Sequence, residues 1–164
     1  KTAESPLVGG SYADYDRFIA EAKFNRPAGV SEQTLHHLID NYGDRVGALL
    51  TLIEEDAALG EPLYAGSPVT GAQIVYAAKA EMSVTLADAV FGRTPLGFFG
   101  WPGETVMRRC AALMTSVTGW DQSQQDEQVE AVRAVYAKRG VAFESGASVE
   151  PNPTERSATQ EVPA

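Results

Sequence analysis

The chain has 164 residues, 44% of them hydrophobic and 21% charged, so it is long enough to bury the core of one globular domain. Its formal net charge of −9 argues against a nucleic-acid-binding protein, which needs a clustered basic surface to displace counterions from phosphates. The single cysteine, Cys110, excludes an internal disulfide framework and is typical of a reducing compartment.

The two ends of the chain differ in composition from its middle. Residues 1–10, "KTAESPLVGG", end in a Gly-Gly turn and are typical of a linker from a preceding domain. The absence of an initial methionine suggests a piece of a longer polypeptide. Residues 11–140 carry helical periodicity, whereas residues 141–164 lose it and collect Pro, Ser, Thr and Glu. The sequence therefore predicts a linker, a helical domain over 11–140 and a disordered tail over 141–164.

Three amphipathic helices are predicted in the N-terminal part of this domain. The first begins near Ser11 and ends before Pro27. Ser31 is a natural N-cap of the second helix, and Gly43 can supply its left-handed end. Asp44 is expected to cap the third helix, which ends before the next Gly-Glu-Pro break. The core-facing residues of these helices are Tyr15, Phe18, Ile19, Ala22, Leu35, Leu38, Ile39, Tyr42, Leu49, Leu52 and Ile53.

A longer helix is predicted to follow. Ser67-Pro68 combines a cap with a proline at the first helical position. The helix should run to about Phe91, which is roughly two dozen residues or about 36 Å at 1.5 Å per residue. Because its residues are apolar on most sides, the pattern predicts a central, buried helix.

Two further helices complete the predicted domain. The fifth ends at Gly119, and the sixth is capped by Asp121 or Ser123 and ends at Gly140. Their apolar stripes are Val106, Cys110, Leu113 and Val117, then Val129, Val132 and Tyr136. No segment alternates as a strand does. The fold is therefore predicted to be all-α, a compact bundle of about six helices around a long central helix.

The predicted central helix carries two carboxylates, Glu81 and Asp88, in apolar surroundings. Seven residues apart, they share a helix face but stand about 10 Å apart along its axis. Retaining glycosidases hold their acids about 5 Å apart, so this spacing disfavours a paired-acid mechanism. The pattern favours buried hydrogen-bonded struts, with Arg93 as the nearest partner for Asp88.

No catalytic, cofactor-binding or metal-binding residue can be assigned. His36 and His37 are adjacent, so they cannot chelate one metal together. His36 and Asp40 could both reach a metal, but two ligands are too few for zinc. Cys110 lies on an apolar stripe, where a buried thiol is inert. Neither a P-loop nor a G-x-G-x-x-G after a strand occurs.

A cluster of aromatic residues lies in the glycine-rich stretch "PLGFFGWPG". Phe98, Phe99 and Trp101 can either close over the core or form an exposed patch. Such a patch could dock on another domain or touch a membrane surface.

Four segments in order resemble the C-terminal helical domain of FAD-dependent (aerobic) glycerol-3-phosphate dehydrogenases. They are "PLVGG", "LHHLIDNYG", "VYAAKAEMSVTLADAVFGRTPLGF" and "GWDQSQQDEQVEAVRAVY". The residues that match the family's signature helix and the arginine-rich segment after it are Glu81, Thr85, Leu86, Asp88, Arg93, Thr94 and Leu96. The chain departs from the family at Gly92 and Pro95, where the family usually has arginines, so the basic surface of that segment is reduced to Arg93 alone.

The resemblance implies a parent enzyme that oxidises sn-glycerol 3-phosphate to dihydroxyacetone phosphate and passes the electrons through FAD to membrane quinone. In that family the flavin and substrate sites lie in the preceding N-terminal domains, which would be the partners of this chain. The resemblance also implies a cytoplasmic enzyme at the inner face of the membrane, with a homodimer left open. The chain itself would then be a non-catalytic cap without FAD. Two alternatives are a free-standing helical protein-interaction module and a small metal-dependent hydrolase using His36 and Asp40.

Overall fold

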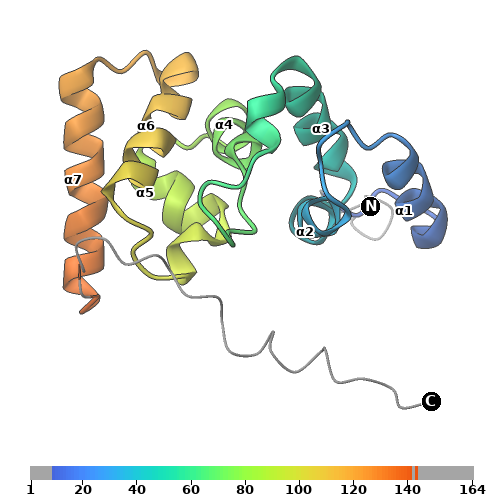
Figure 1. The fold of residues 1–164 in the computed structure, drawn as a ribbon, viewed down its shortest axis with the longest axis horizontal. Helices are drawn as coiled ribbons and strands as arrows, with labels where there is room; N and C mark the ends of the chain where they lie inside the picture. The colour runs from blue at the N-terminus through green and yellow to red at the C-terminus, as the bar shows by residue number, and fades with distance from the viewer. Residues whose placement is uncertain (1–8, 142, 144–164) are drawn as a thin grey trace, which may run out of the picture.

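The computed structural model describes residues 9–141 and 143, and within them the protein is all-α, as predicted. The α-helices are α1 (Tyr15–Phe24), α2 (Glu32–Tyr42), α3 (Val46–Glu55), α4 (Gly71–Ala80), α5 (Leu86–Asp88), α6 (Glu104–Thr118) and α7 (Gln122–Lys138). All but α5 have ten or more residues, which matches the six helices predicted. Figure 1 shows α1–α3 at one end of the molecule, α5–α7 at the other and α4 between them.

Two hydrophobic cores meet at α4. The N-terminal core contains the buried apolar residues of α1–α3, and the C-terminal core contains those of α5–α7. Helix α4 sends Ala72 and Val75 into the first core and Ile74 and Ala77 into the second. This double burial is why its sequence is apolar on most sides. The predicted central place of this segment is confirmed.

The predicted single helix from Ser67 to Phe91 is wrong, because two breaks divide the segment. Helix α4 begins only at Gly71, after one half of a capping box, in which the Gln73 side chain accepts a hydrogen bond from the Thr70 amide. Ser67 instead bonds through its hydroxyl to its own loop. The hydrogen bonds that start a helix lie within a single turn, so the signal at Thr70 can start the helix in place of the earlier one at Ser67.

The second break follows Ala80. Residues 81–85 are not helical, and Met82 has a positive φ of 59°. Thr85 and Asp88 form a second capping box, which starts α5, and the chain continues as a π-helical turn, Ala89–Arg93. A π-turn is a local widening of the helix that often marks functional sites. Glu81 and Asp88 therefore do not share one helix face.

The other predicted helix ends are mostly correct. Ser31 accepts a hydrogen bond from the Thr34 amide, and Asp121, not Ser123, caps α7. Gly119 ends α6 in the left-handed conformation. Asp44 does not cap α3, whose N-cap is Arg45. Its carboxylate instead accepts from the amide of Ser11 in residues 9–14, which precede α1 and are called the entering chain below.

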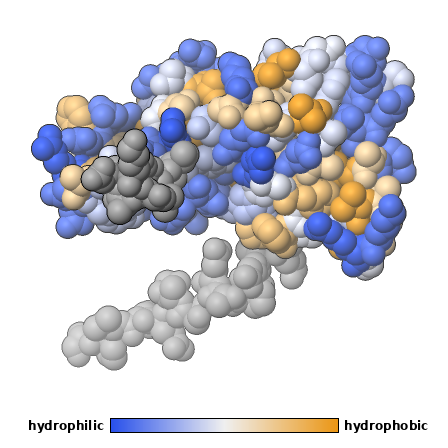
Figure 2. Space-filling view, turned by 180° about the vertical axis from the view of Figure 1, so that it is seen from behind, coloured by the Kyte–Doolittle hydropathy of each residue, from blue (hydrophilic) through white to orange (hydrophobic). Residues whose placement is uncertain are grey.

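The ends of the chain lie largely outside the described residues. The predictions of a linker and of a disordered tail therefore concern, over residues 1–8 and 144–164, residues that the structure does not describe. Val141 and Phe143 pack against the C-terminal core, so the predicted start of the disordered tail at residue 141 is wrong. None of the described helices combines the length and the apolar character that crossing a membrane requires. Figure 2 shows apolar side chains gathered mainly over the half with α4–α7 and a mostly hydrophilic end around α1.

Candidate functional site

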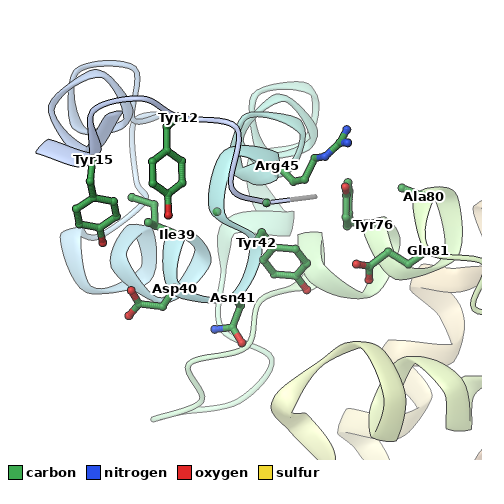
Figure 3. Close-up of a pocket in the computed structure, with 12 residues that line it drawn as sticks. Tyr12, Tyr15, Ile39, Asp40, Asn41, Tyr42, Arg45, Tyr76, Ala80 and Glu81 are labelled. Carbon is green, nitrogen blue, oxygen red and sulfur yellow. The ribbon is translucent and has the colours of Figure 1, made fainter. Parts of the chain in front are cut away.

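An open groove of about 700 Å³ lies where the entering chain, the C-terminal end of α2 and the C-terminal end of α4 meet. We call it the α2–α4 groove (Figure 3). Its lining residues are Gly9, Tyr12, Tyr15, Ile39, Asp40, Asn41, Tyr42, Gly43, Arg45, Tyr76, Ala80 and Glu81. It combines aromatic walls with two carboxylates and a guanidinium group, which is a composition suited to recognition of a polar group.

Aromatic rings form the walls of this groove. Tyr42 of α2 and Tyr76 of α4 meet edge to face, with ring centroids 5.5 Å apart. Tyr12 of the entering chain stacks on Phe18 of α1 at 4.9 Å. Such pairs hold rings in fixed orientations beyond what their area burial requires. The aromatic residues that line the groove therefore come from the entering chain, α1, α2 and α4.

Glu81 lies at the end of α4, and Figure 3 shows its carboxylate directed toward Tyr42. Its Oε2 atom is buried and has no hydrogen-bond partner among the described residues. Burial raises the pKa of this carboxyl, against a smaller opposing effect of the Arg93 charge. A buried carboxylate oxygen without a donor is costly, so a hydrogen bond to this atom would be stabilising.

A buried polar group lies behind the Tyr42 wall. The side chain of Gln73 is fully buried, and its Nε2 atom lies 3.5 Å from both the Tyr42 hydroxyl and His37 Nε2. Burial raises the pKa of Tyr42 to about 12 and lowers the pKa of His37. These contacts join α2 to α4. The sequence analysis did not identify this group, although a glutamine in an apolar helix was the available signal.

The three predicted struts occupy different surroundings. Asp88 is exposed, and its Oδ2 atom accepts from the amides of Val84 and Thr85 at 3.2 and 2.9 Å. Arg93 donates through Nε to the backbone carbonyl of Glu81 at 3.0 Å. The predicted burial of Asp88 and its pairing with Arg93 are therefore wrong, because the break after α4 turns Asp88 into a capping residue. Arg93 does join the two ends of the break.

Replacing Asp88 with alanine is expected to lower the free energy of unfolding by about 1 kcal/mol, the usual cost of losing a capping side chain. The Asp88 carboxylate satisfies two amides at the start of α5, and alanine leaves both without a partner. Asp88→Asn keeps an acceptor oxygen and should retain most of the stability. Denaturant unfolding measures both variants. A loss above about 3 kcal/mol for Asp88→Ala would instead indicate a buried charged pair.

The residues considered for metal binding do not form a metal site in the described part of the chain. His36 lies 3.9 Å from the Glu32 carboxylate, and no group of three or more potential ligands occurs among the described residues. His37 is half-buried against Gln73 rather than solvated. Cys110 is fully buried, and burial raises its pKa to about 12, so the thiolate form is strongly disfavoured.

The aromatic residues after α5 divide between surface and core. Phe98 and Phe99 are 79% and 47% exposed. Trp101 is half-buried and packs edge to face on Tyr136 and Phe143 at 5.4 and 5.2 Å. Only the two phenylalanines are therefore free to serve in the predicted docking patch, whose docking role stays a prediction.

The glycine-rich connection before α6 does not fit FAD. A flavin pyrophosphate needs backbone amides at a helix N-terminus, usually after a glycine-rich turn that follows a strand. The glycine-rich connection here ends at Gly103, the N-cap of α6. Its first helical residue is Glu104, whose carboxylate pairs with Arg108 and Arg133 and would repel a pyrophosphate. That the chain holds no cofactor residue stays a prediction.

Comparison with known proteins identifies related sequences. A family model described as the C-terminal domain of alpha-glycerophosphate oxidase matches residues 1–125. A Synechocystis protein named glycerol-3-phosphate dehydrogenase is 31% identical over 130 residues, which are 79% of this chain and 23% of the relative. A Pseudomonas aeruginosa protein of the same name is 30% identical over 105 residues, 64% of this chain and 20% of the relative. No solved structure matches the chain significantly.

Proposed function

The chain belongs to the family of C-terminal domains of alpha-glycerophosphate oxidase, and on that premise we propose that it is the non-catalytic C-terminal domain of an FAD-dependent glycerol-3-phosphate dehydrogenase. Such an enzyme oxidises sn-glycerol 3-phosphate to dihydroxyacetone phosphate. The supporting observation is that the family match covers residues 1–125, while the chain spans only about a fifth of the length of the curated relatives it matches.

The chemistry of the described residues supports a non-catalytic role. The α2–α4 groove brings together carboxylates, tyrosines and an arginine, but its lining residues include no serine, threonine, cysteine, lysine or histidine to act as a nucleophile. The substrate carries a phosphate, and Asp40 and Glu81 would repel it. We therefore place the flavin and the substrate in the part of the enzyme that precedes this domain.

The wider setting of the enzyme rests on the family resemblance. We propose a cytoplasmic enzyme at the inner face of the membrane that passes electrons from FAD to quinone. The exposed Phe98 and Phe99 would suit a peripheral contact with a membrane or with a neighbouring domain. Homodimer formation stays a prediction, which the mass of the purified enzyme in solution would test.

The proposal is tested by comparing the full-length polypeptide with the 164-residue chain. The full-length protein is expected to be yellow and to reduce an artificial electron acceptor when sn-glycerol 3-phosphate is added. The chain alone is expected to give a helical circular dichroism spectrum without flavin absorbance and without activity, because its glycine-rich connection does not fit FAD.

Two results would contradict this proposal. Flavin fluorescence that co-purifies with the chain alone would assign cofactor binding to these residues. If the full-length polypeptide binds FAD but does not oxidise sn-glycerol 3-phosphate, the proposed substrate is wrong. The comparisons favour this enzyme domain over a free-standing interaction module.

A further inference from the structure

The break after α4 combines a strained backbone with buried polar atoms that lack hydrogen-bond partners, and the packing of the domain explains neither. Met82 has a positive φ of 59°, a backbone conformation that residues with a side chain rarely adopt, and it is 85% exposed. Its neighbours Glu81 and Ser83 each have a buried side-chain oxygen without a hydrogen-bond partner among the described residues. Strained backbone and unsatisfied polar atoms persist where function requires them, so this break is a candidate binding element.

Glu81 presents this break to the α2–α4 groove. Arg93 does not satisfy its carboxylate, since Arg93 Nε donates to the Glu81 backbone carbonyl and its NH1 group to the Gly92 carbonyl. The Tyr42 hydroxyl is directed toward the Glu81 carboxylate in Figure 3. Because the Oε2 atom is buried, a donor that enters the groove between these two side chains would satisfy it only together with a rotation of the Glu81 side chain.

The charge of the groove selects a cation. Asp40 and Glu81 both line it, and Arg45 is its basic residue. The guanidinium of Arg45 lies 3.8 Å from Asp44, so that charge is already offset. An arriving positive charge beside Glu81 would gain from that carboxylate, and Asp40, which lies at the other end of the groove in Figure 3, adds to its negative charge, whereas an anion would meet repulsion.

The entering chain runs along the groove and indicates where the occupant comes from. Gly9 lines the groove, and its carbonyl accepts from the Asp44 amide at 3.2 Å. A domain that precedes residue 1 in a longer polypeptide would be joined to this chain on the side of Gly9, and tethering raises its effective concentration at the groove. The C-terminal residues 144–164 complement the groove poorly, because they contain four glutamates and a single arginine.

We propose that the α2–α4 groove accepts a lysine or arginine side chain from the catalytic part of the same enzyme, with the Glu81 carboxylate as its acceptor. This inference rests on the proposed function and names the surface through which the domain docks. The tyrosines 42 and 76 flank the cation, and the strained break holds Glu81 toward it.

Hydrogen exchange of the full-length polypeptide tests this docking. Glu81→Lys is expected to raise amide exchange in residues 39–45 about tenfold, since it replaces attraction by repulsion across a buried charge pair. Exchange should also rise in a peptide outside residues 1–164 that contains a lysine or arginine. Glu81→Gln, which keeps the size of the side chain, should give a smaller rise in both places. Glu54→Lys, on an exposed position of α3 outside the groove, should change neither.

The identified lysine or arginine provides a rescue. Its replacement by glutamate in the Glu81→Lys protein should restore slow exchange in residues 39–45. Unchanged amide exchange outside residues 1–164 in both Glu81 variants would overturn the proposal. The proposal would also be overturned if dilution of the protein reduced the protection of residues 39–45, because the groove would then be covered by a second copy of the protein. Oxidation of glycerol 3-phosphate by the wild-type protein is measured in parallel. If the wild-type protein does not oxidise glycerol 3-phosphate, the proposed substrate is rejected. The exchange data then still decide whether the groove docks on the rest of the polypeptide.

Discussion

Replacing Tyr136 with alanine is expected to lower the free energy of unfolding by about 3–5 kcal/mol, the usual range for a buried aromatic residue. Tyr136 is 1% exposed and lies in the C-terminal core. Its ring packs on Phe91 and Trp101 with centroid distances of 4.9 and 5.4 Å. Alanine would leave a cavity between α7 and the glycine-rich connection. Denaturant unfolding followed by circular dichroism measures the change.

Tyr136→Phe is the matched control. The Tyr136 hydroxyl is buried without a hydrogen-bond partner among the described residues, and burial raises its pKa to about 12. Removing a buried polar group that has no partner costs little and can stabilise. Phenylalanine should therefore match or exceed the wild-type stability. A large loss in this variant would show that the hydroxyl, not the ring, carries the effect.

Replacing Gly43 with alanine is expected to lower the free energy of unfolding by more than about 2 kcal/mol, because strain and a backbone clash add together. Gly43 has a φ of 52°, which disfavours residues with a side chain. A Cβ atom at this position would lie 1.9 Å from the Gly9 carbonyl oxygen. The entering chain would have to move, and the wall of the α2–α4 groove would open.

Gly47→Ala offers the same substitution at a site without either constraint. Gly47 is exposed in α3, and a Cβ atom there would meet nothing within 4 Å. Alanine in a helix should stabilise by about 0.5–1 kcal/mol relative to glycine. Opposite signs for the two variants, measured by denaturant unfolding, are the expected result. Equal small effects would contradict the close approach of Gly9 and Gly43.

Much of the fold follows from local patterns in the sequence. Apolar residues three and four apart placed α1, α2, α3, α6 and α7 correctly, because the same spacing defines a buried helix face wherever it occurs. The caps at Ser31 and Asp121 were also correct, since a cap depends on hydrogen bonds within one turn. Local signals failed at Ser67, where the later start at Thr70 competes with it, at Asp44, which does not cap α3, and at the break after Ala80.

The candidate site was less predictable than the fold. Glu81 was singled out as a polar residue in apolar surroundings, but as a strut on an unbroken helix. Its actual place depends on the break at Met82, which an apolar run does not reveal. Tyr42 and Tyr76 looked like ordinary core positions, and the groove between them needs the meeting of α2 and α4.

The sequence by itself determined the all-α class, five helix positions and the family, because these depend on residues close together in the chain or on ordered motifs. The tertiary structure alone decided that α4 stops at Ala80, that Gly9 lies against Gly43 and that Glu81 faces Tyr42. The last two features depend on contacts between segments more than thirty residues apart, and the end of α4 is accompanied by the bond from Arg93 to the Glu81 carbonyl, twelve residues away. A local sequence pattern does not show such contacts, because they arise only when distant elements pack together, and this packing can override local preference.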